Sequence, residues 1–327
     1  MKLPQLYKTL VFTISFTLLG CSTVVSSFIN ESNSLSYLNV ASDEDIERYG
    51  FDNGYFCSDS QDVCVSYLEA KPLSVSKLRY TTEIDSNGQE NTVSLEIERT
   101  SLIHDFKGTV VLFHGFRASK EFMINSALFF RFLGFDVLVP DLLGHGKSSG
   151  EKRYGVGDVP IINELINSKV AAGQEIYLLG NSMGSVTASY LSNIRQDISG
   201  VILQAPMVEF DQAVSNYINA TFPLANYFFS KHSIKQGAVI SLKEADLSLG
   251  KTDIKPLIMS SKTPVIIFAS ESDTVAPYSY FKDLESKKVK TVKVQDRNHP
   301  SMAVIGDPES HEIINWLSKI AGIRISN

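Results

Sequence analysis

EIYLLGNSMGSVTASYL, residues 175–191, decides the fold of this 327-residue chain. Its first part is a short apolar run typical of a buried strand, and its last part has the spacing of a helix. Between them lies a Gly-x-Ser-x-Gly turn, in which Gly180 and Gly184 let strand and helix approach closely. Such a turn exposes Ser182 at the carboxyl end of the strand, in the position of a nucleophile. Because the short pattern also arises by chance, its partners have to be found elsewhere in the chain.

Other apolar runs flank this stretch and alternate with segments of helical spacing. They are short, rich in Val and Ile, and fit strands that are buried on both faces. The runs are "GTVVLFHG", "FDVLVPD", "GVILQAP", "TPVIIFAS" and "KTVKVQ". Alternation of this kind predicts an α/β fold, with a mostly parallel sheet and helices on both faces. Residues 207–262 lack a comparable run and are rich in aromatic side chains, so we expect a helical cap insertion over the carboxyl ends of the strands.

A serine hydroxyl becomes a good nucleophile only when a neighbouring base takes its proton. After a nucleophile in such a turn, the acid and then the base are expected in loops that follow later strands. Asp273 follows "VIIFAS", and His299 lies in "DRNHP" after the last strand run. We predict that His299 is the base and that Asp273 holds its imidazole in the productive tautomer.

Several other acidic residues and histidines are weaker candidates for these roles. Glu271 lies close to the expected acid in sequence, and Glu209 follows "ILQAP" much earlier in the chain. His311 falls in the last predicted helix and His232 in the insertion, where structural or surface roles are expected. His114 precedes the nucleophile, and we expect it to orient the loop after "VVLF".

The oxyanion of such a reaction needs two preorganised N–H donors. Met183, which directly follows Ser182, is expected to supply one, and Phe116 in the loop "HGF" the other. Nothing in the sequence suggests a metal site or an organic cofactor. The formal net charge of −6 gives no reason to expect nucleic acid as a partner.

"FHGF", "DLLGHGKSSG", "GNSMG", "SESDTVAP" and "NHP", in this order, resemble the α/β-hydrolase fold. Within that fold the chain resembles the lysophospholipase and monoacylglycerol-lipase branch, which includes serine aminopeptidase-like members. The resemblance covers roughly residues 77–322, and it implies that Asp141, Gly144, His145 and Gly146 shape a loop beside the site. One departure is Asn181, where lipase-like members often carry His.

By this resemblance the chain is expected to be a serine hydrolase that cleaves carboxylic esters through an acyl-enzyme. The aromatic insertion favours a small acyl-ester or lipid-like substrate, such as a lysophospholipid or monoglyceride. Aminopeptidase or amidase chemistry on the same residues is one alternative, although the insertion carries only scattered acidic residues: Glu244, Asp246 and Asp253. A non-catalytic binding lipoprotein that has kept the fold is another.

The N-terminus has the pattern of an export signal. Lys2 and Lys8 precede a short apolar run that ends in "LLGC", which predicts a signal peptide over residues 1–20. The "LLGC" ending resembles the lipobox of bacterial lipoproteins, and this resemblance implies that Cys21 is lipidated. Because Ser22 follows the cysteine, the resemblance implies the outer membrane, on its periplasmic face, in a Gram-negative organism. We therefore expect a lipid-anchored protein of the cell envelope.

Residues 21–76 are expected to be a lipidated, partly disordered tether followed by a segment with two cysteines. Cys57 and Cys64 lie close together in an oxidising compartment, so a disulfide between them is expected. The hydrolase domain is expected over residues 77–322 and opens with a hairpin whose turn is Asn87-Gly88.

Overall fold

The computed structural model describes part of the chain, namely residues 20–31, 41–59, 62–86, 89–102 and 105–322. The predicted signal peptide lies outside the described residues except for Gly20. The predicted Asn87-Gly88 turn and residues 32–40 of the expected tether also lie outside them.

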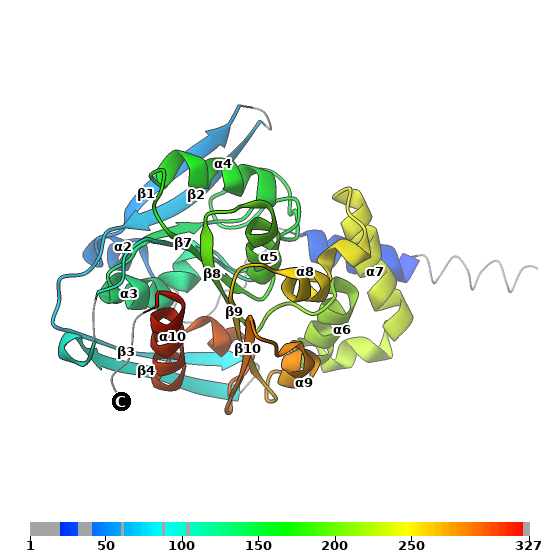
Figure 1. The fold of residues 1–327 in the computed structure, drawn as a ribbon. Coiled ribbons are helices and arrows are strands. Elements are labelled where there is room, and N and C mark those ends of the chain that lie inside the picture. The colour runs from blue at the N-terminus through cyan, green and yellow to red at the C-terminus, as the bar shows by residue number, and fades with distance from the viewer. Residues whose placement is uncertain (1–19, 32–40, 60–61, 87–88, 103–104, 323–327) are drawn as a thin grey trace, which may run out of the picture.

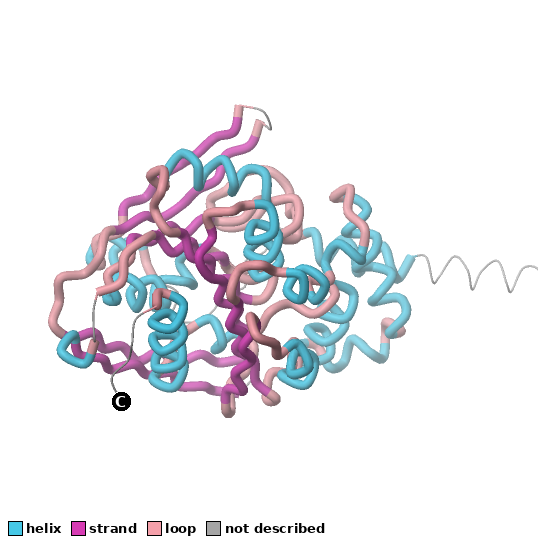
Figure 2. The backbone as a smooth tube through the Cα atoms, in the orientation of Figure 1, coloured by secondary structure: helices cyan, strands magenta, loops and turns pink. Residues whose placement is uncertain are grey.

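An eight-stranded sheet forms the centre of the molecule, with strand order β1-β2-β6-β5-β7-β8-β9-β10. β1 pairs antiparallel with β2, and β2 with β6, whereas all other neighbouring strands are parallel. Figure 2 shows the sheet crossing the molecule with helices on either side. The predicted fold class is therefore confirmed. The strands are β1 Asp52–Ser58, β2 Val63–Ala70, β5 Thr109–Phe113, β6 Asp136–Pro140, β7 Ile176–Asn181, β8 Ile198–Gln204, β9 Val265–Ser270 and β10 Val289–Val294.

Helices cover both faces of this sheet. In Figure 1, α3 and α10 lie on one face, and α4 and α5 lie on the other. A group of helices between β8 and β9 forms the cap, where the sequence predicted an insertion. The helices of the sheet layers are α3 Ile124–Leu133, α4 Val159–Lys169, α5 Gly184–Ile194, α9 Tyr278–Phe281 and α10 Asp307–Ile320. Those of the cap are α6 Phe210–Thr221, α7 Lys231–Glu244 and α8 Lys255–Ser260, and the short α2 Asp43–Arg48 precedes the sheet.

Short 3-10 helices connect several of these elements. They are η1 Arg99–Ser101, η2 Lys120–Met123, η3 Pro223–Tyr227, η4 Leu249–Thr252, η5 Lys282–Leu284 and η6 Pro300–Ala303. Two of them matter for the site, because η6 follows the candidate base and η3 joins the two long cap helices. Within the described ranges, none of the helices combines the length and the hydropathy that a membrane span requires.

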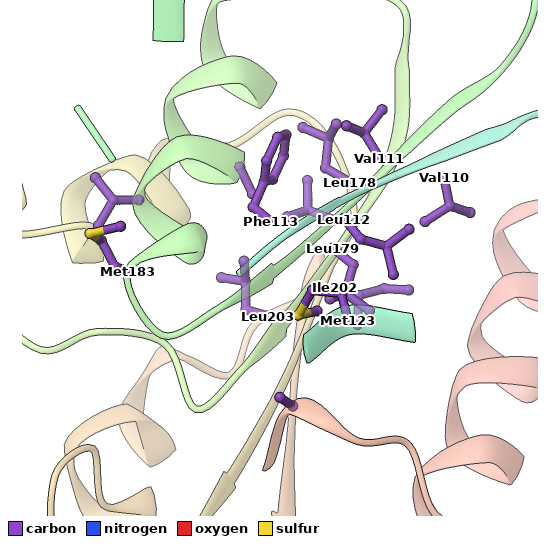
Figure 3. Packing of buried hydrophobic residues seen from close by; sticks show 14 of the residues in the cluster. Val110, Val111, Leu112, Phe113, Met123, Leu178, Leu179, Met183, Ile202 and Leu203 are labelled. Atoms are coloured by element: carbon purple, nitrogen blue, oxygen red, sulfur yellow. The ribbon is translucent and has the colours of Figure 1, made fainter. Parts of the chain in front are cut away.

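The core lies on the central parallel strands. Successive side chains of β5, Val110 to Phe113, are all fully buried because helices cover both faces of the sheet. Figure 3 shows them packed against side chains of β7 and β8. This packing makes β5, β7 and β8 a rigid platform for the loops at their carboxyl ends.

The predicted hairpin forms a separate two-stranded sheet of β3 Lys77–Ser86 and β4 Gln89–Glu98. Val93, Leu95 and Ile97 are the buried side chains of β4, and they alternate with polar residues. The hydroxyl of Tyr80 donates a 2.5 Å hydrogen bond to the carbonyl of Ile305, just before α10. This contact places the hairpin beside the loop that carries His299.

The segment with the two cysteines is part of the main sheet. β1 and β2 extend the main sheet, so the folded unit begins well before the predicted boundary at residue 77. The reason lies in long-range pairing, since β2 runs along β6 and fully buries Val65 and Leu68. The expected disulfide is present and joins Cys57 to Cys64, which face one another across β1 and β2.

The expected tether after Cys21 was only partly disordered, and part of it is ordered in the described residues. Residues 20–30 are helical. Val25 is 4% exposed and Ile29 is 2% exposed, and both belong to the main core. In Figure 1 this helix, drawn in blue, lies beside α7 of the cap. Burial of its apolar face against the cap therefore explains its order.

Candidate active site

Ser182 lies between the end of β7 at Asn181 and the start of α5 at Gly184. Its φ of 48° falls in the left-handed region, which costs a non-glycine residue on the order of 1–3 kcal/mol. Neighbouring structure holds this conformation, because the Ser182 N–H donates to the Gln204 carbonyl at 3.0 Å. A Cβ at Gly184 would lie 2.3 Å from the carbonyl oxygen of Phe113, so only glycine lets helix and strand meet here.

His299 and Asp273 come from loops after β10 and β9, and at the carboxyl edge of the sheet His299 contacts Ser182 while Asp273 contacts His299. The Nε2 atom of His299 lies 2.9 Å from Ser182 Oγ, and its Nδ1 atom lies 2.7 Å from Asp273 Oδ2. A carboxylate oxygen only accepts hydrogen bonds, so Nδ1 carries the proton and Nε2 is free to accept from the serine hydroxyl. The three side chains thus form a continuous hydrogen-bonded chain.

Backbone donors fix the orientation of Asp273, which is fully buried. Its Oδ1 accepts hydrogen bonds from the N–H groups of Val275 at 2.8 Å and Ala276 at 2.9 Å. These two bonds turn Oδ2 toward the imidazole of His299. The carboxylate therefore aligns the base through fixed geometry.

The other candidates for acid and base lie away from this chain of hydrogen bonds. Glu271 is exposed and lies 3.9 Å from Lys293, and Glu209 precedes α6 of the cap. His311 on α10 and His232 on α7 are both exposed. Of the acids and bases that the sequence offered, the structure brings only Asp273 and His299 to Ser182 among the described residues.

His114 holds a loop beside the site, as its position suggested. The ring is fully buried, its Nδ1 atom lies 2.8 Å from the Gly115 carbonyl, and its Nε2 accepts from the Leu142 N–H at 3.0 Å. Burial lowers its pKa, which favours the neutral ring. His114 therefore ties the loop after β5 to the loop after β6.

That same loop carries Phe116, the second expected N–H donor. A Cβ at Gly115 would lie 3.1 Å from Asn181 Oδ1 and 3.2 Å from Ser182 Cβ, so the loop packs directly on the turn. In the part of the chain that the structure describes, the N–H groups of Phe116 and Met183 donate no hydrogen bond to a protein group. Both are available to a negatively charged oxygen formed next to Ser182.

The loop of residues 141–150 is held by a buried ion pair. Lys120 Nζ lies 2.8 Å from Asp141 Oδ2, and both side chains are fully buried. Burial by itself lowers the pKa of Lys120, but Asp141 and Glu121 more than offset this effect and the net shift is upward. His145 lies in the same loop, and its burial lowers its pKa to about 3, so the ring is neutral.

A mostly apolar cavity of about 70 Å³ opens above Ser182, between the sheet and the cap. The cap contributes side chains from α6, and the helix of residues 20–30 contributes two more. The lining residues are Phe28, Ile29, Gly115, Phe116, Arg117, Ala118, Phe122, Asn181, Ser182, Met207, Phe210, Ala213, Val214, Tyr217, Ile218, Val275, His299 and Pro300. Within the described ranges, no three His, Cys, Asp or Glu side chains gather as metal ligands would.

One residue that holds the loop of His299 was not among the candidates predicted from the sequence. Asn91 on β4 accepts hydrogen bonds through Oδ1 from the Asn298 N–H at 2.6 Å and the Ser301 hydroxyl at 2.9 Å. In the alternating pattern of its strand, Asn91 falls on the same face as the buried Val93 and Leu95, so the pattern places this polar side chain facing inward. Only the packing of the hairpin against the loop reveals its role.

A family model described as serine aminopeptidase, S33 matches residues 104–269. This match includes Ser182 and ends before Asp273 and His299. The chain is 23% identical over 201 residues to the uncharacterised protein YqkD of Bacillus subtilis (strain 168). That similarity spans 57% of this chain and 61% of the relative, so the relative is longer than the part that is matched.

Solved structures of esterases and a phospholipase share the fold. The chain is similar to an esterase of Pyrococcus furiosus, with 16% identity and a TM-score of 0.58 over 88% of this chain and 98% of the esterase. It is similar to a membrane phospholipase A described as a bacterial virulence factor, with 16% identity and a TM-score of 0.54 over 97% of this chain and 98% of the phospholipase. It is also similar to a Thermogutta terrifontis esterase, with 17% identity and a TM-score of 0.51 over 82% of this chain and 99% of the esterase.

Proposed function

The chain belongs to the serine aminopeptidase S33 family of α/β hydrolases, and we propose that it is a serine hydrolase that cleaves carboxylic esters of lipid-like substrates. One observation carries this proposal. Ser182, His299 and Asp273 form a hydrogen-bonded chain, with contacts of 2.9 and 2.7 Å, at the base of an apolar cavity. A serine, a base and an orienting acid in this geometry suit nucleophilic attack on a carbonyl.

In the proposed first half-reaction, the Ser182 hydroxyl attacks the ester carbonyl carbon while His299 Nε2 takes the hydroxyl proton. The electron pair of the C=O bond moves onto oxygen, and the N–H groups of Phe116 and Met183 donate to this oxyanion. When the carbonyl forms again, the bond to the alcohol oxygen breaks and His299 gives its proton to that oxygen. The products are an acyl ester on Ser182 and a free alcohol.

The second half-reaction uses water as the nucleophile. His299 Nε2 takes a proton from water, whose oxygen bonds to the acyl carbon and forms a second oxyanion. As that oxyanion collapses, the bond to Ser182 Oγ breaks, and His299 returns its proton to Oγ. The carboxylic acid leaves, and the enzyme regains its starting state. Asp273 remains ionised and stabilises the imidazolium form of His299 in both halves.

The walls of the cavity support an acyl substrate. Of its described lining residues, none is Asp or Glu, whereas an aminopeptidase would need a carboxylate to hold a free amino terminus. Glu244, one of the scattered acids of the insertion, instead accepts hydrogen bonds from Ser26 and Asn30. We therefore favour a lysophospholipid or monoglyceride over a peptide.

We also propose that the enzyme is exported and anchored to a membrane of the cell envelope through lipid on Cys21. The support is the "LLGC" sequence after a basic and apolar leader. Cys21 is partly exposed and lies outside the disulfide. Each buried methylene of an attached acyl chain contributes about 0.8 kcal/mol to membrane binding, so two or more chains hold a protein firmly.

The test of the reaction is hydrolysis of p-nitrophenyl esters, lysophospholipids, monoglycerides and aminoacyl amides by purified variants. Ser182→Ala and His299→Ala should each lower kcat by several orders of magnitude. The double variant should be little worse than either, because the two residues act as one unit. Asp273→Asn should lower kcat on the order of 10⁴-fold, since it favours the wrong tautomer of His299.

His311→Ala is the matched control, because His311 is exposed on α10 and should not affect kcat. A fluorophosphonate probe should label the wild type and not Ser182→Ala. Near-normal hydrolysis by a folded Ser182→Ala variant would refute the proposal. Preferential cleavage of aminoacyl amides would retain Ser182 as nucleophile and assign the chain to the amidase alternative.

A further inference from the structure

We propose that the helix of residues 20–30 forms the outer wall of the acyl pocket and that Phe28 determines which acyl-chain lengths the enzyme accepts. This inference rests on the proposed ester hydrolysis at Ser182. The helix was expected to belong to a tether, so no substrate role followed from its sequence. Its contacts with the cavity and with the cap indicate one.

Phe28 and Ile29 line the same cavity as Ser182 and His299. The ring of Phe28 meets the ring of Phe222 edge-on, with centroids 5.7 Å apart. The guanidinium of Arg117 also lies 4.3 Å from the centre of the Phe28 ring. These two contacts restrict the ring to one place, which a wall residue that selects substrates requires.

The helix is fitted closely to α7 of the cap. A Cβ at Gly237 of α7 would lie 2.5 Å from Cγ1 of Val25, so the glycine lets the two helices approach. Ser26 and Ser241 share a buried hydrogen bond of 3.0 Å between their hydroxyls. Asn30 Nδ2 donates a 2.5 Å hydrogen bond to Glu244 at the end of α7.

Two buried cations hold the carboxyl end of the helix. Arg117 donates to the Phe28 carbonyl, and Lys152 Nζ donates to the carbonyls of Ile29 and Asn30, each at 3.2 Å. Arg117 is 5% exposed and Lys152 is 7% exposed. Because the carboxyl end of a helix carries partial negative charge, both cations face their electrostatic complement there. This clamp holds Phe28 at the cavity that Ser182 also lines.

The size of the cavity makes the wall decisive for chain length. Its volume of about 70 Å³ is well below the roughly 300–1,000 Å³ of typical ligand sites. An acyl group bonded to Ser182 therefore fills the cavity after a few carbons, and a longer chain has to pass its wall, to which Phe28 belongs. Removing that ring opens the wall toward Phe222, which is 42% exposed at the surface.

The experiment compares kcat/KM for p-nitrophenyl esters from acetate to palmitate in the wild type, Phe28→Ala and Phe28→Trp. Phe28→Ala should raise the ratio of long-chain to short-chain kcat/KM about tenfold or more, the scale set by one or two methylenes in an apolar pocket. Phe28→Trp should lower the same ratio. Val24→Ala is the matched control, because Val24 is on the same helix, is 56% exposed and does not line the cavity.

Fluorophosphonate labelling of each preparation separates this inference from the proposed function. An unlabelled and inactive wild type would refute ester hydrolysis at Ser182 itself. Labelled, active variants whose chain-length ratios all equal that of the wild type would overturn the role of Phe28 alone. Phe28→Leu, which keeps an apolar side chain, replaces Phe28→Ala if circular dichroism shows that the alanine variant is unfolded, and it should shift the ratio in the same direction.

Discussion

Gly184→Ala tests whether the geometry of the turn at Ser182 is what makes the serine reactive. Gly184 is the first residue of α5, two positions after Ser182, and it faces the end of β5. The added methyl carbon would lie 2.3 Å from the carbonyl oxygen of Phe113 and 2.6 Å from its carbonyl carbon. Both atoms belong to the backbone of a buried strand, so neither can turn aside as a side chain would.

The expected loss of kcat follows from how far α5 and β5 must move apart to accept the new methyl group. Ordinary contact begins near 3.4 Å, so α5 and β5 must separate by about 1 Å to accept the methyl group. A displacement of that size at a reacting group lowers turnover about 10²-fold. Overpacking of a well-filled core also lowers the free energy of unfolding, by about 1–3 kcal/mol. Gly184→Ala should therefore remain folded while losing most of its kcat.

The assay is kcat for a short p-nitrophenyl ester, measured together with urea unfolding of the same preparations. Gly250→Ala is the matched control, because a Cβ there meets nothing within 4 Å and its backbone does not adopt a positive φ. The control should keep both kcat and stability. A Gly184→Ala variant with the kcat of the wild type would show that reactivity does not depend on this close approach.

Three further predictions concern the ends and supports of the fold. Replacing Cys57 and Cys64 by Ser should lower the free energy of unfolding by about 2–3 kcal/mol, because the disulfide closes a short loop and so removes only modest entropy from the unfolded chain. The replacement should leave kcat unchanged, because β1 and β2 lie at the edge of the sheet. Lys120→Met should lower the free energy of unfolding, measured with urea, by about 3–5 kcal/mol, because it leaves the buried Asp141 carboxylate without its cation. Cys21→Ser should abolish metabolic labelling with a fatty acid.

Each of these three has an outcome that would contradict it. A cysteine-free hairpin with unchanged stability would mean that strand pairing alone fixes β1 and β2. If Lys120→Met lowers the free energy of unfolding by less than 1 kcal/mol, other groups compensate the buried charge of Asp141. Equal fatty-acid label in the wild type and Cys21→Ser would mean that Cys21 is not the acceptor.

Local sequence was sufficient to identify the candidate nucleophile. The strand, the turn and the helix around Ser182 are contiguous, so their order can be recognised without any distant contact. α5 covers Gly184–Ile194, as its helical spacing predicted. The loops of Asp273 and His299 could be chosen for a related reason, since the carboxyl ends of parallel strands meet at one edge of a sheet.

Tertiary structure alone decided what surrounds these three residues. Asn91 supports the loop of His299 across more than two hundred positions of sequence, and its strand indicates only that the side chain faces inward, not what it contacts. The strand β2 joins the sheet because β6 offers it a partner and a core for Leu68. Such pairings depend on how distant segments are brought together, which a local pattern cannot specify.

The helix of residues 20–30 shows the difference most clearly. Residues 22–50 are rich in Ser and Asn and show no sustained periodicity, so the sequence predicted a tether. The folded protein provides what the segment lacks: Gly237 leaves room for Val25, and Arg117 and Lys152 bind its terminal carbonyls. Ser182 could be identified from contiguous sequence, whereas the wall over it exists only because three distant parts of the chain meet.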